Sequence, residues 1–206
     1  MNDLETSWQG AWQALQLPVP DDRVLASLLT RWAEPHRRYH TLQHLRECLA
    51  LSENTRALAR WPGEVAIAVW FHDAIYDTSR HDNEMRSADW AREVLLETGA
   101  TSECAARVHA LIMATCHGEM PVLPDAKLLV DIDLAILGAA PARFDEYERQ
   151  IRAEYGFVPE ARFRAKRAEI LRGFLERPVL FSTPVHAARF DAPARANLAR
   201  ALAALG

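Results

Sequence analysis

One short stretch of the sequence, residues 69–84 (VWFHDAIYDTSRHDNE), places ionisable side chains directly after a run that belongs in a protein core. The segment VAIAVWF before His72 and Asp73 is apolar at every position, so a helix formed there would be buried on all sides. A second nearly all-apolar segment, AKLLVDIDLAILG, carries Asp131 and Asp133. Burial of ionised groups costs free energy unless they pair or bind a metal, so the fold must supply partners for them.

The pattern around these two segments is helical. Leu4, Trp8 and Trp12 recur every four residues, and similar spacings follow along the chain, which is typical of amphipathic helices. Ala, Leu, Arg and Glu are abundant, while few stretches are rich in Val, Ile and Thr, so helices are favoured over strands. The 206 residues suffice for one domain with a sizeable core. We therefore predict an all-α, single-domain multi-helix bundle over residues 1–206.

Several residues predict where helices begin and end. Asp21 and Thr41 precede periodic apolar segments and are expected to be N-caps, because their side-chain oxygens can accept from the first backbone N–H groups. Gly99 follows a helical segment at the position where a left-handed residue is favoured. A helix is predicted over residues 63–77, which would place Asp77 one turn after the His-Asp pair and on the same face.

Charge and composition exclude several classes of function. The formal net charge is −4 and basic residues are scattered among acidic ones, so no nucleic-acid partner is expected. No apolar run approaches the ~18 residues of a membrane span, and no basic segment near the start suggests a secretory signal. Cys48, Cys104 and Cys116 lack CxxC spacing and are interpreted as small core residues. We expect a cytoplasmic monomer or homodimer without a membrane partner.

Three apolar helical segments carry residues that could share one buried cation: His44, the pair His72-Asp73, and Asp131 with Asp133. Imidazole and carboxylate together suit a divalent ion such as Mn, Fe, Ni, Zn, Co or Mg, whereas a thiolate-rich structural zinc site is not indicated. A single ion would compensate all of these groups at once. The alternative is that His72 and Asp73 form a buried hydrogen-bonded pair without a metal.

The order of His44, His72-Asp73 and Asp133 resembles the H…HD…D signature of the HD-domain superfamily, which comprises metal-dependent phosphohydrolases with an all-helical core. A bacterial group of predicted HD phosphohydrolases is similar over most of residues 39–198, through the blocks YHTLQH, FHDAIYD, DNEMRSA, DIDLAILG, FLERPVLF and ARANL. The resemblance implies a metal-site core over about residues 36–138 and a C-terminal helical extension over about residues 141–206. It also implies that the four signature residues hold one divalent ion per chain, with Asp131 as the alternative to Asp133.

The resemblance further implies hydrolysis of a small phosphorylated substrate, with a nucleotide as the first candidate, by metal-activated water. Asp77 is a candidate to orient or deprotonate the water or to protonate the leaving oxygen. Asn83 and Glu84 are further catalytic candidates, with helix capping as their structural alternative. The remaining candidates fall into two sets. The first could support the metal ligands or bind a second metal and consists of His40, His117 and Asp131; the second could contact phosphate and consists of Arg37, Arg38, Arg80 and Lys166.

Two other functions remain open at the level of the sequence. The additional histidines His40 and His117 permit an HD-like di-iron oxygenase, which would hold two irons and use dioxygen. A non-catalytic module that binds a metal or a nucleotide is the second alternative. Other catalytic signatures are absent from the sequence, including GxxxxGK, GxGxxG and GxSxG.

Overall fold

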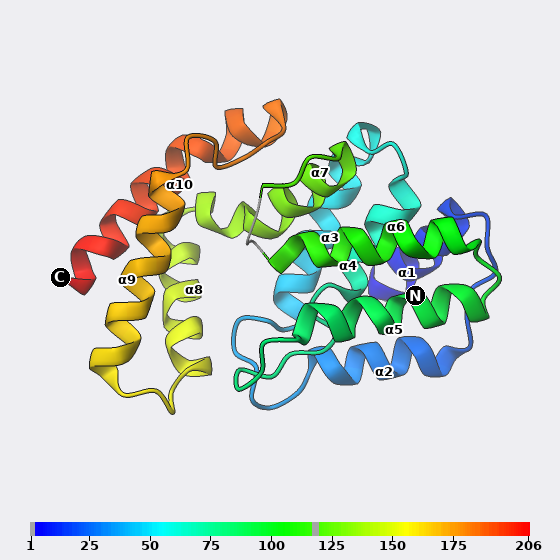
Figure 1. Cartoon of the computed structure of the whole chain (residues 1–206), viewed down its shortest axis with the longest axis horizontal. Coiled ribbons are helices and arrows are strands. Elements are labelled where there is room, and N and C mark those ends of the chain that lie inside the picture. Colours follow the sequence, from blue (N-terminus) through cyan, green and yellow to red (C-terminus); the bar gives the residue numbers. More distant parts are fainter. Residues whose placement is uncertain (1–2, 117–119) are drawn as a thin grey trace. The chain divides into compact units, whose positions relative to one another are not determined.

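The structure, a computed structural model, describes residues 3–116 and 120–206. All regular elements within these ranges are helices, which confirms the predicted all-α class (Figure 1). The α-helices are α1 (Asp3–Ala14), α2 (Asp22–Trp32), α3 (Leu42–Asn54), α4 (Pro62–Phe71), α5 (Asn83–Glu97), α6 (Ser102–Met113), α7 (Pro124–Asp133), α8 (Pro141–Glu154), α9 (Glu160–Glu176) and α10 (Pro184–Leu205). Three short 3-10 helices are η1 (Arg56–Leu58), η2 (Ala114–Cys116) and η3 (Leu134–Gly138).

The chain divides into two compact units, Met1–Ile132 and Asp133–Gly206, where the sequence predicts a single domain. The boundary falls at the last residue of α7, close to the end of the predicted metal-site core. Among the described helices, none is both long enough and apolar enough to cross a membrane.

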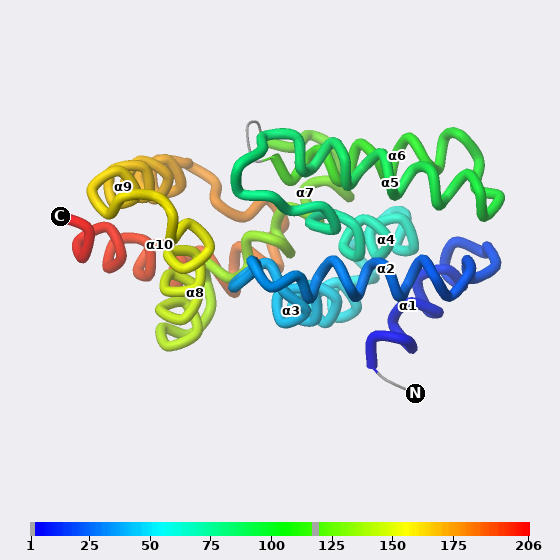
Figure 2. The backbone as a smooth tube through the Cα atoms, turned by 90° about the horizontal axis from the view of Figure 1, so that it is seen from below, coloured from blue at the N-terminus to red at the C-terminus, as the bar shows by residue number. Residues whose placement is uncertain are grey.

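Helix α4 is the central element of the first unit. It packs against α1, α3, α5 and α6, and nearly all of its residues are buried, as its uniformly apolar sequence predicts. Helices α5 and α6 lie side by side along their length and cover part of this core (Figures 1 and 2).

Tryptophans join α1 to α4. The Trp8 ring lies edge-on to the rings of Trp12 and Trp70, with centroids 5.4 and 5.1 Å apart. The two helices also approach closely at Gly63, where a Cβ atom would lie 2.9 Å from the backbone nitrogen of Leu15. Only glycine fits this position without a backbone shift. Large aromatic side chains and one close backbone contact thus fix α1 on the central helix.

The predicted helix boundaries are confirmed at three positions. Asp21 caps α2 by accepting from the backbone N–H of Arg23, and Thr41 caps α3 by accepting from that of Gln43. Gly99 has a φ of 93°, so it adopts the left-handed conformation expected after α5.

The helix predicted over residues 63–77 is shorter than expected, because α4 ends at Phe71. The following segment is a loop whose backbone bonds to side chains instead of continuing the helix. Asn83 at the start of α5 accepts from the backbone N–H of Asp77 at 3.1 Å and donates to its carbonyl at 2.9 Å. The prediction that Asp77 shares a helical face with the His-Asp pair is therefore wrong.

A residue of another helix anchors the segment that leads into α4. The buried carboxylate of Asp125, in the first turn of α7, accepts from the backbone N–H groups of Arg60 and Trp61 at 2.7 and 2.8 Å. These N–H groups belong to the two residues before α4, whose N-cap residue Trp61 makes no capping hydrogen bond through its side chain. Asp125 thus ties α7 to α4.

A buried acid inside α4 is paired with an arginine. Glu64 is 3% exposed, and both of its oxygens accept from Arg107 of α6, at 2.8 and 2.6 Å. The pair compensates the buried charge in the central helix without involving the His-Asp segment.

The second unit is built from η3 and the last three helices. α10 packs against both η3 and α9. The side chain of Asn197 donates to the carbonyls of Leu137 and Ala139, both at 2.9 Å. A Cβ atom at Gly138 would lie 2.7 Å from the backbone oxygen of Phe190, so η3 and α10 touch backbone to backbone.

Candidate metal centre

Two buried histidines form the centre of the site. His44 lies in the first turns of α3, and His72 caps the C-terminus of α4. They are 1% and 2% exposed, and their Nε2 atoms lie 3.2 Å apart. The helices that the apolar segments form therefore bring together two imidazoles that are 28 residues apart in the sequence.

Hydrogen bonds on the far side of each ring orient these nitrogens. The Nδ1 atom of His72 lies 2.8 Å from the carbonyl of Val69, so Nδ1 carries the proton and Nε2 presents a lone pair. The Nδ1 atom of His44 lies 3.0 Å from the hydroxyl of Tyr39, which accepts the proton of Nδ1 when His44 is in the same tautomer and donates to Nδ1 in the other. This arrangement is typical of histidines that ligate a metal, since the outer hydrogen bond sets the tautomer and the ring orientation.

The separation of the two Nε2 atoms fits a shared ion. Bonds of about 2.0–2.1 Å from nitrogen to a metal place two ligand nitrogens about 2.8–3.4 Å apart for angles between about 90° and about 110°. The measured separation is 3.2 Å. Without an ion, His44 protonated on Nε2 would donate a hydrogen bond to Nε2 of His72 across this distance, whereas with an ion between them both nitrogens act as ligands.

Carboxylates complete the donor set. An oxygen of Asp73 lies 3.2 Å from Nε2 of His72 and 3.8 Å from Nε2 of His44. Asp133, the last residue of α7, contributes a carboxylate oxygen to a group in which all donor atoms lie within 4.8 Å of one another. Asp131 is fully buried two residues earlier and is not in that group.

The group also contains the thiol of a cysteine that is not among the ligands predicted from the sequence. Cys48 lies one turn after His44 on α3, with Sγ 3.6 Å from Nδ1 and 3.7 Å from Nε2 of that histidine. The thiol is buried, as expected of a core cysteine, and it is also one of the four clustered donors. The i, i+4 spacing from His44 is the sequence signal that could have found it. A sulfur donor makes the set softer than imidazole and carboxylate alone, which favours Zn, Fe or Co over Mg.

His44, Cys48, His72 and Asp133 thus form a cluster that could hold a metal ion. The donor set and the outer hydrogen bonds fit a divalent transition metal. The sequence-predicted ligand Asp73 lies against the same two imidazoles.

Asp77 lies in the loop after α4 and is engaged by Ser79. Its Oδ1 atom accepts from the backbone N–H and from the hydroxyl of Ser79, at 2.9 and 2.6 Å. These hydrogen bonds lower the pKa of Asp77 below the ordinary value of an aspartate, with smaller contributions from Arg80 and His36. Asp77 is therefore an ionised hydrogen-bond acceptor rather than a strong base.

The other catalytic candidates lie at the start of α5. The amide of Asn83 is used to close the loop around Asp77. Glu84 is partly buried in the first turn of α5, where its charge contributes to a raised pKa of the Cys116 thiol, which burial raises most. This role differs from the helix capping that the sequence offered as the alternative for Asn83, because the N-cap residue of α5 is Asp82.

His40 stands beside the cluster. Its ring stacks on Tyr76 with centroids 4.1 Å apart, and it lies edge-on to His44 at 5.9 Å. It is thus adjacent to a donor of the cluster without being part of the group. The other additional histidine, His117, lies outside the described residues.

The basic residues predicted to contact phosphate differ in their surroundings. Arg37 is buried, and its guanidinium donates to backbone carbonyls. Arg38 is exposed, and Arg80 is paired with Asp82 on the surface. Lys166 belongs to α9 of the second unit, where it pairs with Glu169.

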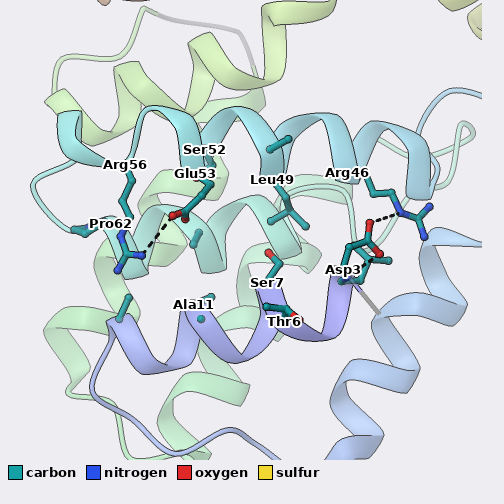
Figure 3. Close-up of a pocket in the computed structure, with 15 residues that line it drawn as sticks. Asp3, Thr6, Ser7, Ala11, Arg46, Leu49, Ser52, Glu53, Arg56 and Pro62 are labelled. Carbon is teal, nitrogen blue, oxygen red and sulfur yellow. Dashed lines mark hydrogen bonds and ion pairs between the residues drawn. The ribbon is translucent and has the colours of Figure 1, made fainter. Parts of the chain in front are cut away.

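A cavity of about 480 Å³ lies elsewhere in the first unit, between α1, α3 and the start of α4 (Figure 3). Its walls carry the ion pairs of Arg46 with Asp3 and of Arg56 with Glu53. None of its lining residues is a donor of the cluster. The residues of α3 that line the cavity lie on the face of that helix opposite His44. This cavity is therefore separate from the metal centre.

No family model, no curated protein and no solved structure matches this chain. The chemistry of the cluster is therefore interpreted from the residues that form it.

Proposed function

We propose that this protein is a metal-dependent phosphohydrolase of the HD type that acts on a small phosphorylated metabolite, with nucleotides as the first candidates. The observation that carries the proposal is the pair of buried Nε2 atoms of His44 and His72, 3.2 Å apart and flanked by carboxylates. The order of these donors along the chain is that of the H…HD…D signature.

In this proposal His44, His72, Asp73 and Asp133 hold one divalent ion, with the thiol of Cys48 beside them. A bound divalent ion supplies an activated water at neutral pH and polarises a phosphoryl oxygen, so the chain needs no nucleophile of its own. The outer hydrogen bonds to the two imidazoles keep the Nε2 lone pairs directed at the ion.

The role proposed for Asp77 is to orient rather than to deprotonate. A general base works best when its pKa lies near the working pH, and the pKa of Asp77 is lowered by Ser79. Since Ser79 engages Oδ1, Oδ2 is the oxygen that can accept a hydrogen bond from a water or from the substrate. Arg38 and Arg80 are the proposed phosphate contacts, because both guanidinium groups are exposed.

The test is the release of inorganic phosphate from a panel of nucleotides and sugar phosphates in the presence of Mn²⁺, Co²⁺, Ni²⁺ or Mg²⁺. We expect turnover by the wild type and a loss of at least about 100-fold in His72→Ala, which removes a ligand. The matched control is His109→Ala, since His109 pairs with Asp89 between α5 and α6 and is not in the cluster.

The proposal fails if the wild type, loaded with each metal in turn, releases phosphate from no member of the panel. Two irons per chain together with oxygen-dependent turnover would show that the protein is an oxygenase instead. Nucleotide binding without turnover would show that it is a binding module.

A further inference from the structure

We propose that Arg37 is a positioning residue of the metal centre. Its guanidinium clamps together two backbone segments, the one that leads into His44 and the one that carries Asp73. The inference rests on the metal centre of the proposed function and is independent of the substrate.

Every N–H group of this guanidinium has an acceptor. Nη1 of Arg37 donates to the carbonyls of His40 and Asp73, at 3.1 and 2.7 Å. Nη2 donates to the carbonyl of Ala74 at 3.1 Å and lies 3.2 Å from the carboxylate of Glu34. Nε donates to the same carboxylate at 3.2 Å. An arginine has five N–H groups, and these five contacts account for all of them.

Aromatic rings hold the guanidinium in place. Arg37 lies 5.4 Å from the ring centroid of Trp32 and 5.4 Å from that of Tyr76, within cation–π range of both. Its side chain is 0% exposed. Tyr76 in turn stacks on His40. The clamp is therefore rigid and shielded from water, which strengthens each of its hydrogen bonds.

The clamp bonds two carbonyls that lie beyond the end of α4. Because α4 ends at Phe71, the carbonyls of Asp73 and Ala74 lie beyond the helix and cannot bond within it. Arg37 satisfies both, and so fixes the backbone of Asp73 while its carboxylate lies 3.2 Å from Nε2 of His72. Nη1, which donates to the carbonyl of Asp73, also donates to the carbonyl of His40, four residues before His44.

The same contacts argue against the phosphate role predicted from the sequence. With all five N–H groups committed and the side chain buried, Arg37 has no donor for a substrate oxygen. Lysine cannot replace it, because three donors on one nitrogen cannot reach acceptors spread around a planar fork.

The experiment measures Co²⁺ affinity by the visible absorption of bound cobalt, in competition with a chelator, for wild type, Arg37→Gln and Arg37→Lys. Loss of a residue that orients metal ligands typically costs 10- to 100-fold in affinity, so we expect about that loss in Arg37→Gln. Arg37→Lys keeps the charge but not the fork, and we expect about a 10-fold loss.

The matched control is Arg107→Gln. Arg107 also pairs with a buried acid in the first unit, so its loss should lower stability while leaving Co²⁺ affinity at the wild-type value. The urea midpoint of each variant separates a change at the metal centre from a general loss of stability.

Wild-type Co²⁺ affinity in a folded Arg37→Gln protein would overturn the inference while leaving the metal centre intact. If Arg37→Gln does not fold, unchanged affinity in Arg37→Lys has the same meaning. An equal loss of Co²⁺ affinity in Arg107→Gln would also overturn the inference, since the loss of affinity would then follow from lower stability alone. A wild type that takes up no Co²⁺ would remove both the inference and the metal centre.

Discussion

Ser79 sets the ionisation of Asp77, which is the residue proposed to orient a water or the substrate. Because two hydrogen bonds from Ser79 favour the charged carboxylate, its pKa lies below the ordinary value. A group with a depressed folded pKa stabilises the folded state above its unfolded pKa, and this contribution is lost as the pH falls through the folded pKa. The contribution of Asp77 is therefore present at neutral pH and disappears in acid.

Substitution of this serine gives the first prediction. In Ser79→Ala the hydroxyl hydrogen bond is lost, so the pKa of Asp77 should rise toward the ordinary aspartate value. A carboxyl ¹³C NMR titration measures the shift directly. Asp82 serves as the control in the same titration, because its pKa is lowered mainly by Arg80 and should stay unchanged. An unaltered titration of Asp77 would show that Ser79 does not control it.

Some residues of the site could be predicted from the sequence, and others could not. His44, His72 and Asp133 are recognisable because their types and order form a pattern, and the structure brings all three together. Cys48 and Arg37 are not recognisable in this way. A cysteine in a helix and an arginine before a helix have ordinary explanations. Arg37 gains another role through a contact with Asp73, which is distant in sequence, and Cys48 through its place one turn after a ligand, His44.

At the level of elements, α7 anchors the residues that lead into α4. Asp125 accepts from two backbone N–H groups that precede α4, and it is buried, so water cannot replace it. We predict that Asp125→Ala lowers the free energy of unfolding by about 2–3 kcal/mol, measured by urea denaturation.

The control for this prediction is Asp21→Ala. Asp21 caps a helix, but it is exposed and accepts from a single N–H group, that of Arg23. Its loss should cost about 1 kcal/mol or less. Equal losses in the two variants would mean that the bridge from α7 contributes no more than an ordinary cap.

The helices themselves illustrate what periodicity and composition can predict. The all-helical class, the buried α4 and the caps at Asp21 and Thr41 follow from local patterns, and all are confirmed. The end of α4 at Phe71 does not follow from them. It depends on Asn83 and Arg37, whose side chains take over the backbone groups of the following loop. Tertiary partners thus end a helix that its own sequence would continue.

At the level of the whole molecule, the core of the chain is proposed to be built around a metal ion. The donors come from α3, from the end of α4 and from the end of α7, and three of them, His44, Cys48 and His72, are buried, where an isolated charge is costly. A shared ion explains why ionisable residues occur in these segments. It also explains the approach of the two Nε2 atoms, each oriented by a hydrogen bond on the other side of its ring.

The most direct measurement is the metal content per chain by elemental analysis, after purification without chelator and reconstitution with Mn²⁺, Fe²⁺, Co²⁺, Ni²⁺ or Zn²⁺. It compares the wild type with the double variant His72→Ala, Asp73→Ala, and with His109→Ala as the control. We predict one tightly held ion in the wild type and in the control, and none in the double variant. Equal metal in all three proteins, or none in the reconstituted wild type, would contradict a metal centre at this site.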